Sequence, residues 1–162
     1  NIFYLDKKVI SSKINSNKKV EKFFIFKKYP SNLEIKIEKT NFIAIIKKNK
    51  VDYYIGLNGN LIKTDDPQIE LPFIFGEPDT KKFLEFKKII DNSTLGFNKI
   101  KNLYYFKSDR WDLETKDGLI IKFPSKQIET SFNILSMILK REDFKNIKII
   151  DFRHNNQIII DE

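Results

Sequence analysis

Cysteine is absent from the 162 residues, and histidine occurs once, as His154. Without cysteine the chain can form neither a disulfide framework nor a thiolate metal site. Glycine is scarce, and Gly56 and Gly59 fall inside a predicted hairpin rather than in a phosphate loop between a strand and a helix. The sequence therefore predicts no catalytic residues, no metal ligands and no cofactor.

Long hydrophobic runs are also missing. No stretch approaches the roughly 20 apolar residues of a membrane-spanning helix, and none resembles a signal peptide. Charge of one sign is concentrated instead: of the net charge of +8, residues 1–50 carry +9, residues 51–100 carry −2 and residues 101–162 carry +1. This distribution suggests an anionic neighbour for the N-terminal third, such as a lipid surface, a nucleic acid or an acidic protein, and an ordinary solvated surface is an equal alternative.

Hydrophobic periodicity and turn residues predict three helices and several short strands. The expected helices cover residues 6–14, 79–91 and 125–141, with Asp6, Asp79 and Ser125 at their starts. The expected strands cover residues 20–28, 33–37, 42–48, 98–107, 110–116 and 119–123, with an Asn-Gly hairpin over residues 53–62 and a loop over residues 67–78. The order predicts an α+β fold, in which a helix-strand-strand lobe precedes a mostly antiparallel sheet packed with two helices.

One strand of this sheet carries most of the charged residues that could act as a site. Asp112 and Glu114 alternate with Trp111 and Leu113, so the two carboxylates share a face. Because Arg110 and Lys116 flank them on that face, we expect a solvated network of charges across strands rather than acid–base chemistry. The protein is therefore not expected to be an enzyme.

Nucleic-acid binding is the other activity that composition suggests. Phe24 and Phe26 stand among lysines, a mixture that resembles a stacking platform for bases. The alternation of the strand over residues 20–28 instead predicts that both rings face the core. We therefore expect no nucleic-acid partner.

The C-terminal segment is predicted to be an open edge of the sheet. A strand that ends near Asp151 is followed by an Asn155-Asn156 turn and a last strand from Gln157 to Asp161. Ile158 and Ile160 should share one face of this strand and Ile159 the other. A terminal strand without a guaranteed neighbour exposes backbone groups that can accept a strand from another chain.

Several segments, taken in this order, resemble the extracytoplasmic part of the FtsQ/DivIB family of bacterial cell-division proteins. The segments that carry the resemblance are the Tyr29-Pro30-x-x-Leu33 turn with the Ile43-Ala44 pair, the hairpin from Leu57 to Ile62, Leu71-Pro72-x-x-x-Gly76, Arg110-Trp111 with Asp117-Gly118, and Asp151-Phe152-Arg153. The chain departs from the family where Phe42 replaces a usual proline. It also begins at Asn1, where the family already has a cytoplasmic tail, a membrane helix and the first strand and helix of a POTRA lobe.

The resemblance implies a partial POTRA lobe over residues 1–41 and a β lobe over residues 42–162. It implies a non-enzymatic scaffold of the divisome, held in the bacterial inner membrane by a single N-terminal helix absent from this chain, with this region in the periplasm. The implied partners are the FtsB/FtsL subcomplex and other division proteins, recruited by strand addition at the C-terminal edge. The residues expected to bind the partner are Arg110, Arg153, His154, Asn155, Asn156, Gln157, Ile158, Ile159 and Ile160.

Arg153 is the side chain expected to contribute most, because a guanidinium can hold a carboxylate through two hydrogen bonds. The basic N-terminal third is expected to contact anionic lipid. Two alternatives stay open from the sequence: a POTRA-type chaperone module of outer-membrane protein assembly, and a nucleic-acid-binding α+β domain.

Overall fold

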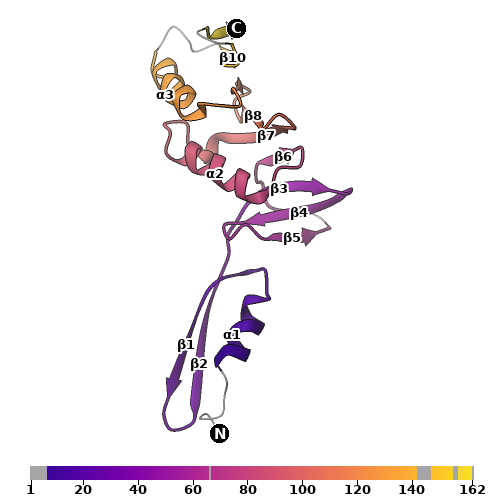
Figure 1. Cartoon of the computed structure of the whole chain (residues 1–162), viewed down its shortest axis with the longest axis vertical. Coiled ribbons are helices and arrows are strands. Elements are labelled where there is room, and N and C mark those ends of the chain that lie inside the picture. Colours follow the sequence, from indigo (N-terminus) through magenta and orange to yellow (C-terminus); the bar gives the residue numbers. More distant parts are fainter. Residues whose placement is uncertain (1–6, 66, 142–146, 155–156, 162) are drawn as a thin grey trace.

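The computed structural model describes residues 7–65, 67–141, 147–154 and 157–161, which form an elongated molecule with a narrow waist (Figure 1). The helices are α1 (Lys7–Asn15), α2 (Thr80–Asp91) and α3 (Ile128–Ile138), with a 3-10 turn η2 (Phe97–Lys99). The strands are β1 (Val20–Lys28), β2 (Asn32–Lys39), β3 (Phe42–Lys48), β4 (Val51–Gly56), β5 (Leu61–Thr64), β6 (Phe73–Phe75), β7 (Ile100–Phe106), β8 (Arg110–Thr115), β9 (Ile120–Lys122), β10 (Ile149–Asp151) and β11 (Ile159–Asp161).

The N-terminal lobe consists of α1 and the antiparallel hairpin β1–β2, which confirms the predicted order of helix, strand and strand. The prediction that Phe24 and Phe26 of β1 face the core is wrong, however. Phe23 and Ile25 are half-buried, whereas Phe24 and Phe26 are 46% and 45% exposed. Both faces of β1 carry aromatic or aliphatic residues, so alternation alone could not decide which face would be covered.

The sheet lobe contains the other nine strands in the order β11-β10-β9-β8-β7-β6-β3-β4-β5. Five of its neighbouring pairs are antiparallel, and the pairs β3–β6, β6–β7 and β9–β10 are parallel. The sheet is therefore mostly antiparallel, as predicted. β6 lies inside the stretch that we expected to be a loop, because a three-residue strand between Pro72 and Gly76 is too short to show a period.

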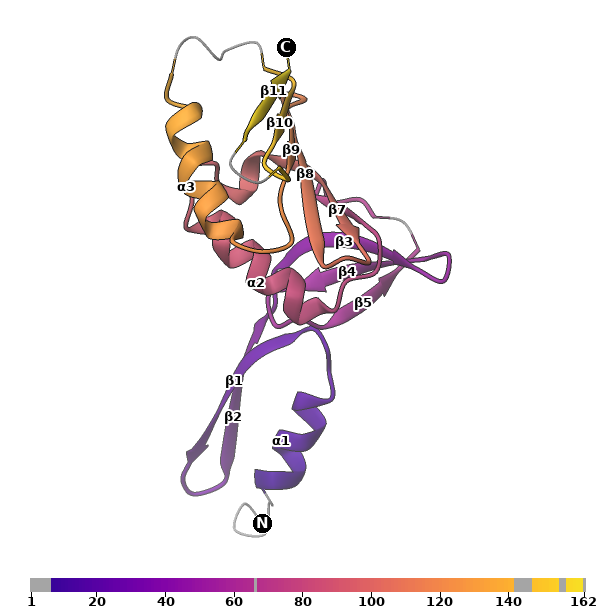
Figure 2. The same ribbon diagram turned by 45° about the horizontal axis from the view of Figure 1, so that its top comes forward.

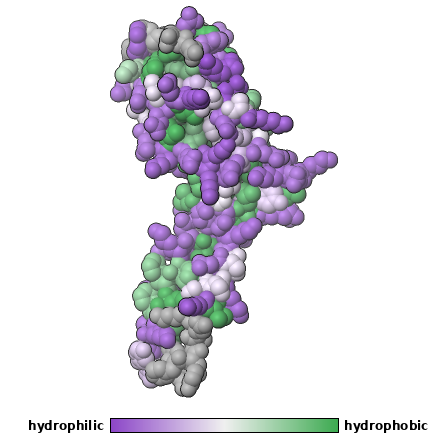
Figure 3. Space-filling view, in the orientation of Figure 1, coloured by the Kyte–Doolittle hydropathy of each residue, from purple (hydrophilic) through white to green (hydrophobic). Residues whose placement is uncertain are grey.

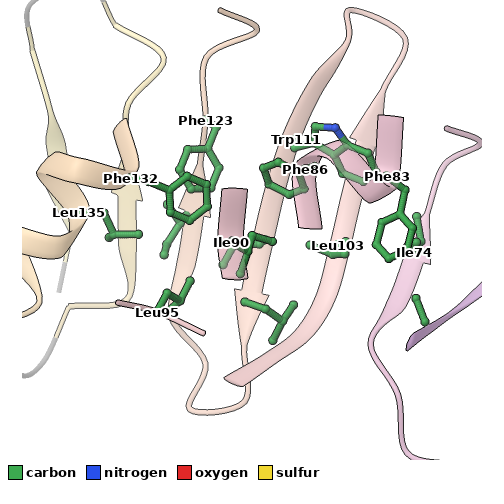
Figure 4. Packing of buried hydrophobic residues seen from close by; sticks show 14 of the residues in the cluster. Ile74, Phe83, Phe86, Ile90, Leu95, Leu103, Trp111, Phe123, Phe132 and Leu135 are labelled. Carbon is green, nitrogen blue, oxygen red and sulfur yellow. The ribbon is translucent and has the colours of Figure 1, made fainter. Parts of the chain in front are cut away.

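Helices α2 and α3 lie on the same side of the sheet lobe (Figure 2). Aromatic rings join the layers: Phe86 of α2 stacks on Trp111 of β8 with centroids 4.8 Å apart, and Phe132 of α3 stacks on Phe123 at 4.5 Å. Figure 4 shows these rings together with Ile90 and Leu103 in one continuous core. The opposite face of the sheet carries the charged residues of β8 and is free of these two helices.

The predicted start is confirmed for α2 and is wrong for α3. Asp79 caps α2, because its carboxylate accepts a hydrogen bond of 2.8 Å from the backbone N–H of Lys81. The α3 helix begins at Ile128 rather than near Ser125, after Gln127 in the left-handed conformation. The predicted cap at Asp6 lies outside the described residues. Among the residues that are described, no helix is long and apolar enough to span a membrane.

The two sheets meet at a short connector. The small sheet ends at Lys39, the large sheet begins at Phe42, and Thr40 and Asn41 lie between them. The division into folding units over residues 1–41 and 42–162 stays a prediction, because a boundary between sheets does not establish that each part folds alone.

Candidate partner-binding site

β11 is the last strand in the order of the sheet lobe, and it pairs with β10 on one side. Residues 152–158 connect the two strands, so β11 begins at Ile159 rather than at the predicted Gln157, and the strands end before the predicted turn. The backbone N–H of Gln157 does donate to the carbonyl of His154 at 3.4 Å, a bond typical of a four-residue turn. Asn155 and Asn156 themselves lie outside the described residues.

The three consecutive isoleucines have different surroundings. Ile160 pairs with the fully buried Ile150 and packs against the core. Ile159 pairs with Asp151 on the helix-free face and is 47% exposed. Ile158 precedes the strand and is also exposed. Two of the three isoleucines are thus accessible to a partner, and one anchors the edge to the core.

Arg153 folds back onto the end of β10. Its Nε lies 2.9 and 3.0 Å from the two carboxylate oxygens of Asp151, and its backbone N–H donates to the same carboxylate at 2.9 Å. Nη2 completes a two-point contact with Asp151. These hydrogen bonds lower the pKa of Asp151 and fix the direction of the guanidinium. Asp151 thus engages Nε and Nη2 of the guanidinium, and the Arg153 side chain is 35% exposed.

Asp112 is buried, with 6% of its surface exposed, and not solvated as expected. Burial raises the pKa of Asp112, while the charges of Arg110 and Arg153 act in the opposite direction. Arg110 Nε lies 3.3 Å from Asp112 Oδ1, an ion-pair distance. Within the described part of the chain, neither of these two buried atoms makes a hydrogen bond.

A charged row links Arg110 to the edge strand. Asp112 on β8 pairs with Lys122 on β9, Lys122 pairs with Asp151 on β10, and Asp151 pairs with Ile159 on β11. Because directly paired residues share a face of a sheet, the row runs along the helix-free face. Acidic and basic side chains alternate along it, and it ends at the exposed Ile159.

A depression of about 810 Å³ lies beside this row, where β9 and β10 end. It brings together five of the nine predicted residues, Arg110, Arg153, His154, Gln157 and Ile158. Other lining residues, which were not predicted from the sequence, lie in the connection from β9 to α3 and in the first turns of α3. These residues are Pro124, Ser125, Lys126, Gln127, Thr130, Ser131 and Ile134.

The missed residues have a topological origin. β9 and β10 are parallel, so the loops that follow them meet at the same end of the sheet. A parallel pair between segments far apart in the sequence leaves no local signal. If the sequence had shown that β10 pairs with β9, the loops that follow these two strands could have been predicted to lie together.

We use the term "β11 site" for Arg110, Arg153, His154, Gln157, Ile158 and Ile159. It offers backbone groups of an edge strand, two guanidinium groups and two exposed isoleucines. Within the described ranges, no group of three or more His, Cys, Asp or Glu is placed to hold a metal ion. The arrangement suits an extended peptide that carries apolar and acidic side chains.

Comparison with known proteins agrees with the sequence motifs. The sequence model of the family described as "Cell division protein FtsQ/DivIB, C-terminal" matches residues 44–153, about two thirds of the chain. This range runs from within β3 to the end of β10 and closes at Arg153, and it therefore includes Arg110 and the first two residues of the loop before β11.

Curated relatives cover nearly the whole chain. The cell division protein FtsQ of Rickettsia bellii (strain RML369-C) is 24% identical over 164 residues, which cover 99% of this chain and 61% of the relative. FtsQ of Rickettsia prowazekii (strain Madrid E) is 27% identical over 168 residues, covering 98% and 61%. DivIB of Bacillus subtilis (strain 168) is 28% identical over 123 residues, covering 72% and 47%. The chain thus spans about three fifths of the length of these two Rickettsia relatives.

A solved structure also resembles this chain. It is the major extracytoplasmic domain of the division protein DivIB from Geobacillus stearothermophilus, with a TM-score of 0.45 and 16% identity. The match covers 67% of this chain and 98% of that domain.

Proposed function

The chain belongs to the FtsQ/DivIB family of cell-division proteins, and we propose that it is a non-enzymatic scaffold that recruits the FtsB/FtsL subcomplex by strand addition at β11. The observation that carries the proposal is the position of β11 at the end of the sheet, with Ile159 exposed and the depression of Arg110 and Arg153 beside it. An uncovered edge strand with exposed isoleucines is an aggregation hazard, which a partner strand removes.

Affinity and specificity come from different parts of the β11 site. Main-chain hydrogen bonds to β11 give affinity that depends little on the partner's sequence. Ile159 on the helix-free face and Ile158 at the depression select apolar side chains of the partner. Arg153, already oriented by Asp151, and Arg110 select carboxylates of the partner through charge-assisted hydrogen bonds.

A pull-down with the periplasmic segments of FtsB and FtsL tests this mechanism. Ile159→Pro removes a backbone donor from β11, and Lys63→Pro removes one from β5, the strand at the opposite edge of the same sheet. We expect Ile159→Pro to abolish capture and Lys63→Pro to leave it intact. Equal capture by both variants, or loss with Lys63→Pro alone, contradicts strand addition at β11.

Arg153→Lys separates charge from geometry at the β11 site. Lysine keeps the positive charge but cannot make the two-point contact of a guanidinium. We expect weaker capture than with the wild type, and we expect Arg141→Lys, a change outside the β11 site, to have no effect. Unchanged capture by Arg153→Lys would remove the guanidinium from the proposed mechanism but not the strand addition.

We further propose that the protein acts at the bacterial inner membrane, anchored by one N-terminal helix outside this chain, with this region in the periplasm. The N-terminal lobe, an incomplete POTRA lobe in this proposal, would then lie next to anionic lipid. Support comes from its surface, where hydrophobic side chains gather as in Figure 3. Phe24, Phe26 and Tyr29 are exposed on β1 and at the hairpin tip.

Lysines accompany these rings. Lys22 and Lys28 flank Phe24 and Phe26 on the same face of β1, and Lys36 Nζ lies 5.6 Å from the ring centroid of Phe26. Exposed aromatics beside basic residues suit the interface of an anionic bilayer, where each lysine contributes about 1 kcal/mol. The contribution is screened by salt over roughly 8 Å at physiological ionic strength.

Liposome co-sedimentation tests the lipid contact. Vesicles that contain phosphatidylglycerol should retain the protein at low salt, and Phe26→Ser should reduce binding. Phe75→Ser is the matched control, because Phe75 of the sheet lobe is 45% exposed, as is Phe26. Binding that is independent of anionic lipid and of salt contradicts the contact. Preferential binding to single-stranded DNA would instead support the nucleic-acid alternative.

A further inference from the structure

The waist between the two lobes contains a set of hydrogen bonds centred on Asn58. This residue lies in the turn between β4 and β5, and its side chain contacts the loop that enters β1. Its side-chain Nδ2 donates to the carbonyl oxygens of Lys18 and Val20, at 3.1 and 3.0 Å. Its Oδ1 accepts from the backbone N–H of Asn60 at 3.0 Å. One carboxamide thus joins its own turn to two backbone groups of the N-terminal lobe.

The connector between the sheets is bound at both of its residues. The backbone N–H of Thr40 donates to the carbonyl of Lys19 at 2.9 Å, and the carbonyl of Asn41 accepts from Leu57 at 2.9 Å. Thr40 is buried, and its Oγ1 lies 3.4 Å from the backbone N–H of Asn58. The two residues that could act as a hinge are therefore held by the loop before β1 and by the β4–β5 turn.

Gly56 shows how closely these groups are packed. A Cβ atom at this position would lie 2.7 Å from Oδ1 of Asn58 and 2.8 and 2.9 Å from the Thr40 side chain. Contacts below 3.0 Å require a neighbour to move. The absence of a side chain at Gly56 is thus needed for Asn58 and Thr40 to occupy their positions.

We propose that Asn58 is a latch that fixes the orientation of the N-terminal lobe relative to the sheet lobe. An asparagine suits this role because one side chain supplies both the donors for the N-terminal lobe and the acceptor that shapes its own turn. The latch holds the β11 site, at the far end of the sheet, in a set direction relative to the N-terminal lobe. It is a property of the two lobes alone and does not rest on the proposed partner.

Distance measurements between spin labels test the latch. The chain has no cysteine of its own, so Asn32→Cys on β2 and Lys116→Cys after β8 provide one label in each lobe. Asn58→Asp keeps the size and the acceptor but removes both donors to Lys18 and Val20. In the Asn58→Asp variant we expect a broader distribution of the distance between the two spin labels.

Asn60→Asp is the matched control. It introduces the same negative charge two residues away and, among the described residues, removes one long contact, from Asn60 Nδ2 to the carbonyl of Lys18 at 3.5 Å. We expect its distribution to stay close to that of the wild type. Equal broadening by both variants, or no broadening with Asn58→Asp, overturns the proposal.

Two further measurements keep loss of folding apart from loss of the latch. A label pair inside the sheet lobe, Lys63→Cys with Lys116→Cys, should keep a narrow distribution in the Asn58→Asp variant. Gly56→Ala should reproduce the broadening between the lobes by displacing Asn58 and Thr40. A narrow distribution between the lobes in Gly56→Ala contradicts the latch.

Discussion

Glu114 on the helix-free face is held by side chains of the neighbouring strand β7. Glu114 accepts hydrogen bonds from Lys101 at 3.0 Å, from Asn102 at 2.9 Å and from the hydroxyl of Tyr104 at 2.8 Å. The bonds from Asn102, Lys101 and Tyr104 lower the pKa of Glu114 to about 2. The sequence predicted that Glu114 would lie on this face but not that neighbouring β7 would supply its partners.

Replacement of Glu114 by glutamine should reduce stability. Glu114→Gln loses the charge that strengthens three hydrogen bonds, and we expect a loss of about 1–2 kcal/mol in the free energy of unfolding at pH 7. Because the folded pKa lies below the ordinary value of 4.5, the stabilisation is complete above pH 4.5 and disappears as the pH falls toward about 2. Urea unfolding of both proteins across this pH range checks the prediction. A difference in free energy of unfolding that does not become smaller in acid contradicts it.

Asp112 should behave in the opposite way. Its raised pKa means that burial disfavours the charged form in the folded state, despite Arg110 and Arg153. We expect Asp112→Asn to be at least as stable as the wild type at pH 7. As the pH falls through the raised pKa, Asp112 becomes protonated, and the free energy of unfolding of the wild type should rise relative to that of the variant. Thermal unfolding at several pH values measures the difference. A wild type that is clearly more stable at pH 7 would show that the Arg110 ion pair outweighs burial.

At the scale of elements, the sequence predicted most of the fold because each long element carries its own period and its own boundary residues. β1 occupies the predicted residues 20–28, and α2 begins after its predicted cap at Asp79. The predictions are wrong where contacts between distant segments determine whether a strand forms or which of its faces is buried. β6 pairs with β3 and β7, which are distant in the sequence, and Phe24 faces solvent while Phe23 and Ile25 on the other face of β1 are half-buried.

The candidate site shows the same division. The sequence predicted the edge strand and the charged residues near it, since both are local features. It did not predict that Ile160 anchors the edge to the core, or that the loop before α3 reaches the depression. Those properties depend on the pairing of β10 with β9, which residues 123–148 separate in the sequence.

The packing of α2 on the sheet should be a main source of stability. Phe86 is 2% exposed and contacts the rings of Trp111, Phe123 and Phe132. Phe86→Ala leaves a cavity among these rings, and we expect a loss of about 3–5 kcal/mol in the free energy of unfolding. Phe75→Ala, at a half-exposed ring beside Phe73 and Tyr104, should cost less, about 1–2 kcal/mol. Denaturant titration of both variants tests this, and similar losses would contradict the assignment of the core.

At the scale of the whole molecule, the two edges of the nine-stranded sheet differ. β5 carries Lys63 near the waist, and a charged residue is a common protection for an edge strand. β11 carries Ile159 and Ile160 instead and adjoins two arginines. If the latch holds the lobes in one orientation, β11 projects at the end of the molecule opposite to the N-terminal lobe (Figure 1). The account therefore assigns the two ends different tasks, membrane contact and partner recruitment.

Hydrogen–deuterium exchange tests strand addition at β11 most directly. The backbone amides of Ile159–Asp161 are measured with and without the periplasmic FtsB/FtsL segments, and those of Leu61–Thr64 in β5 serve as the internal control. A partner strand bonds to outward-facing amides of β11 and stabilises its pairing with β10, so exchange there should slow while exchange at β5 stays unchanged. Binding without slower exchange at β11, or with slower exchange at β5 instead, would contradict the account.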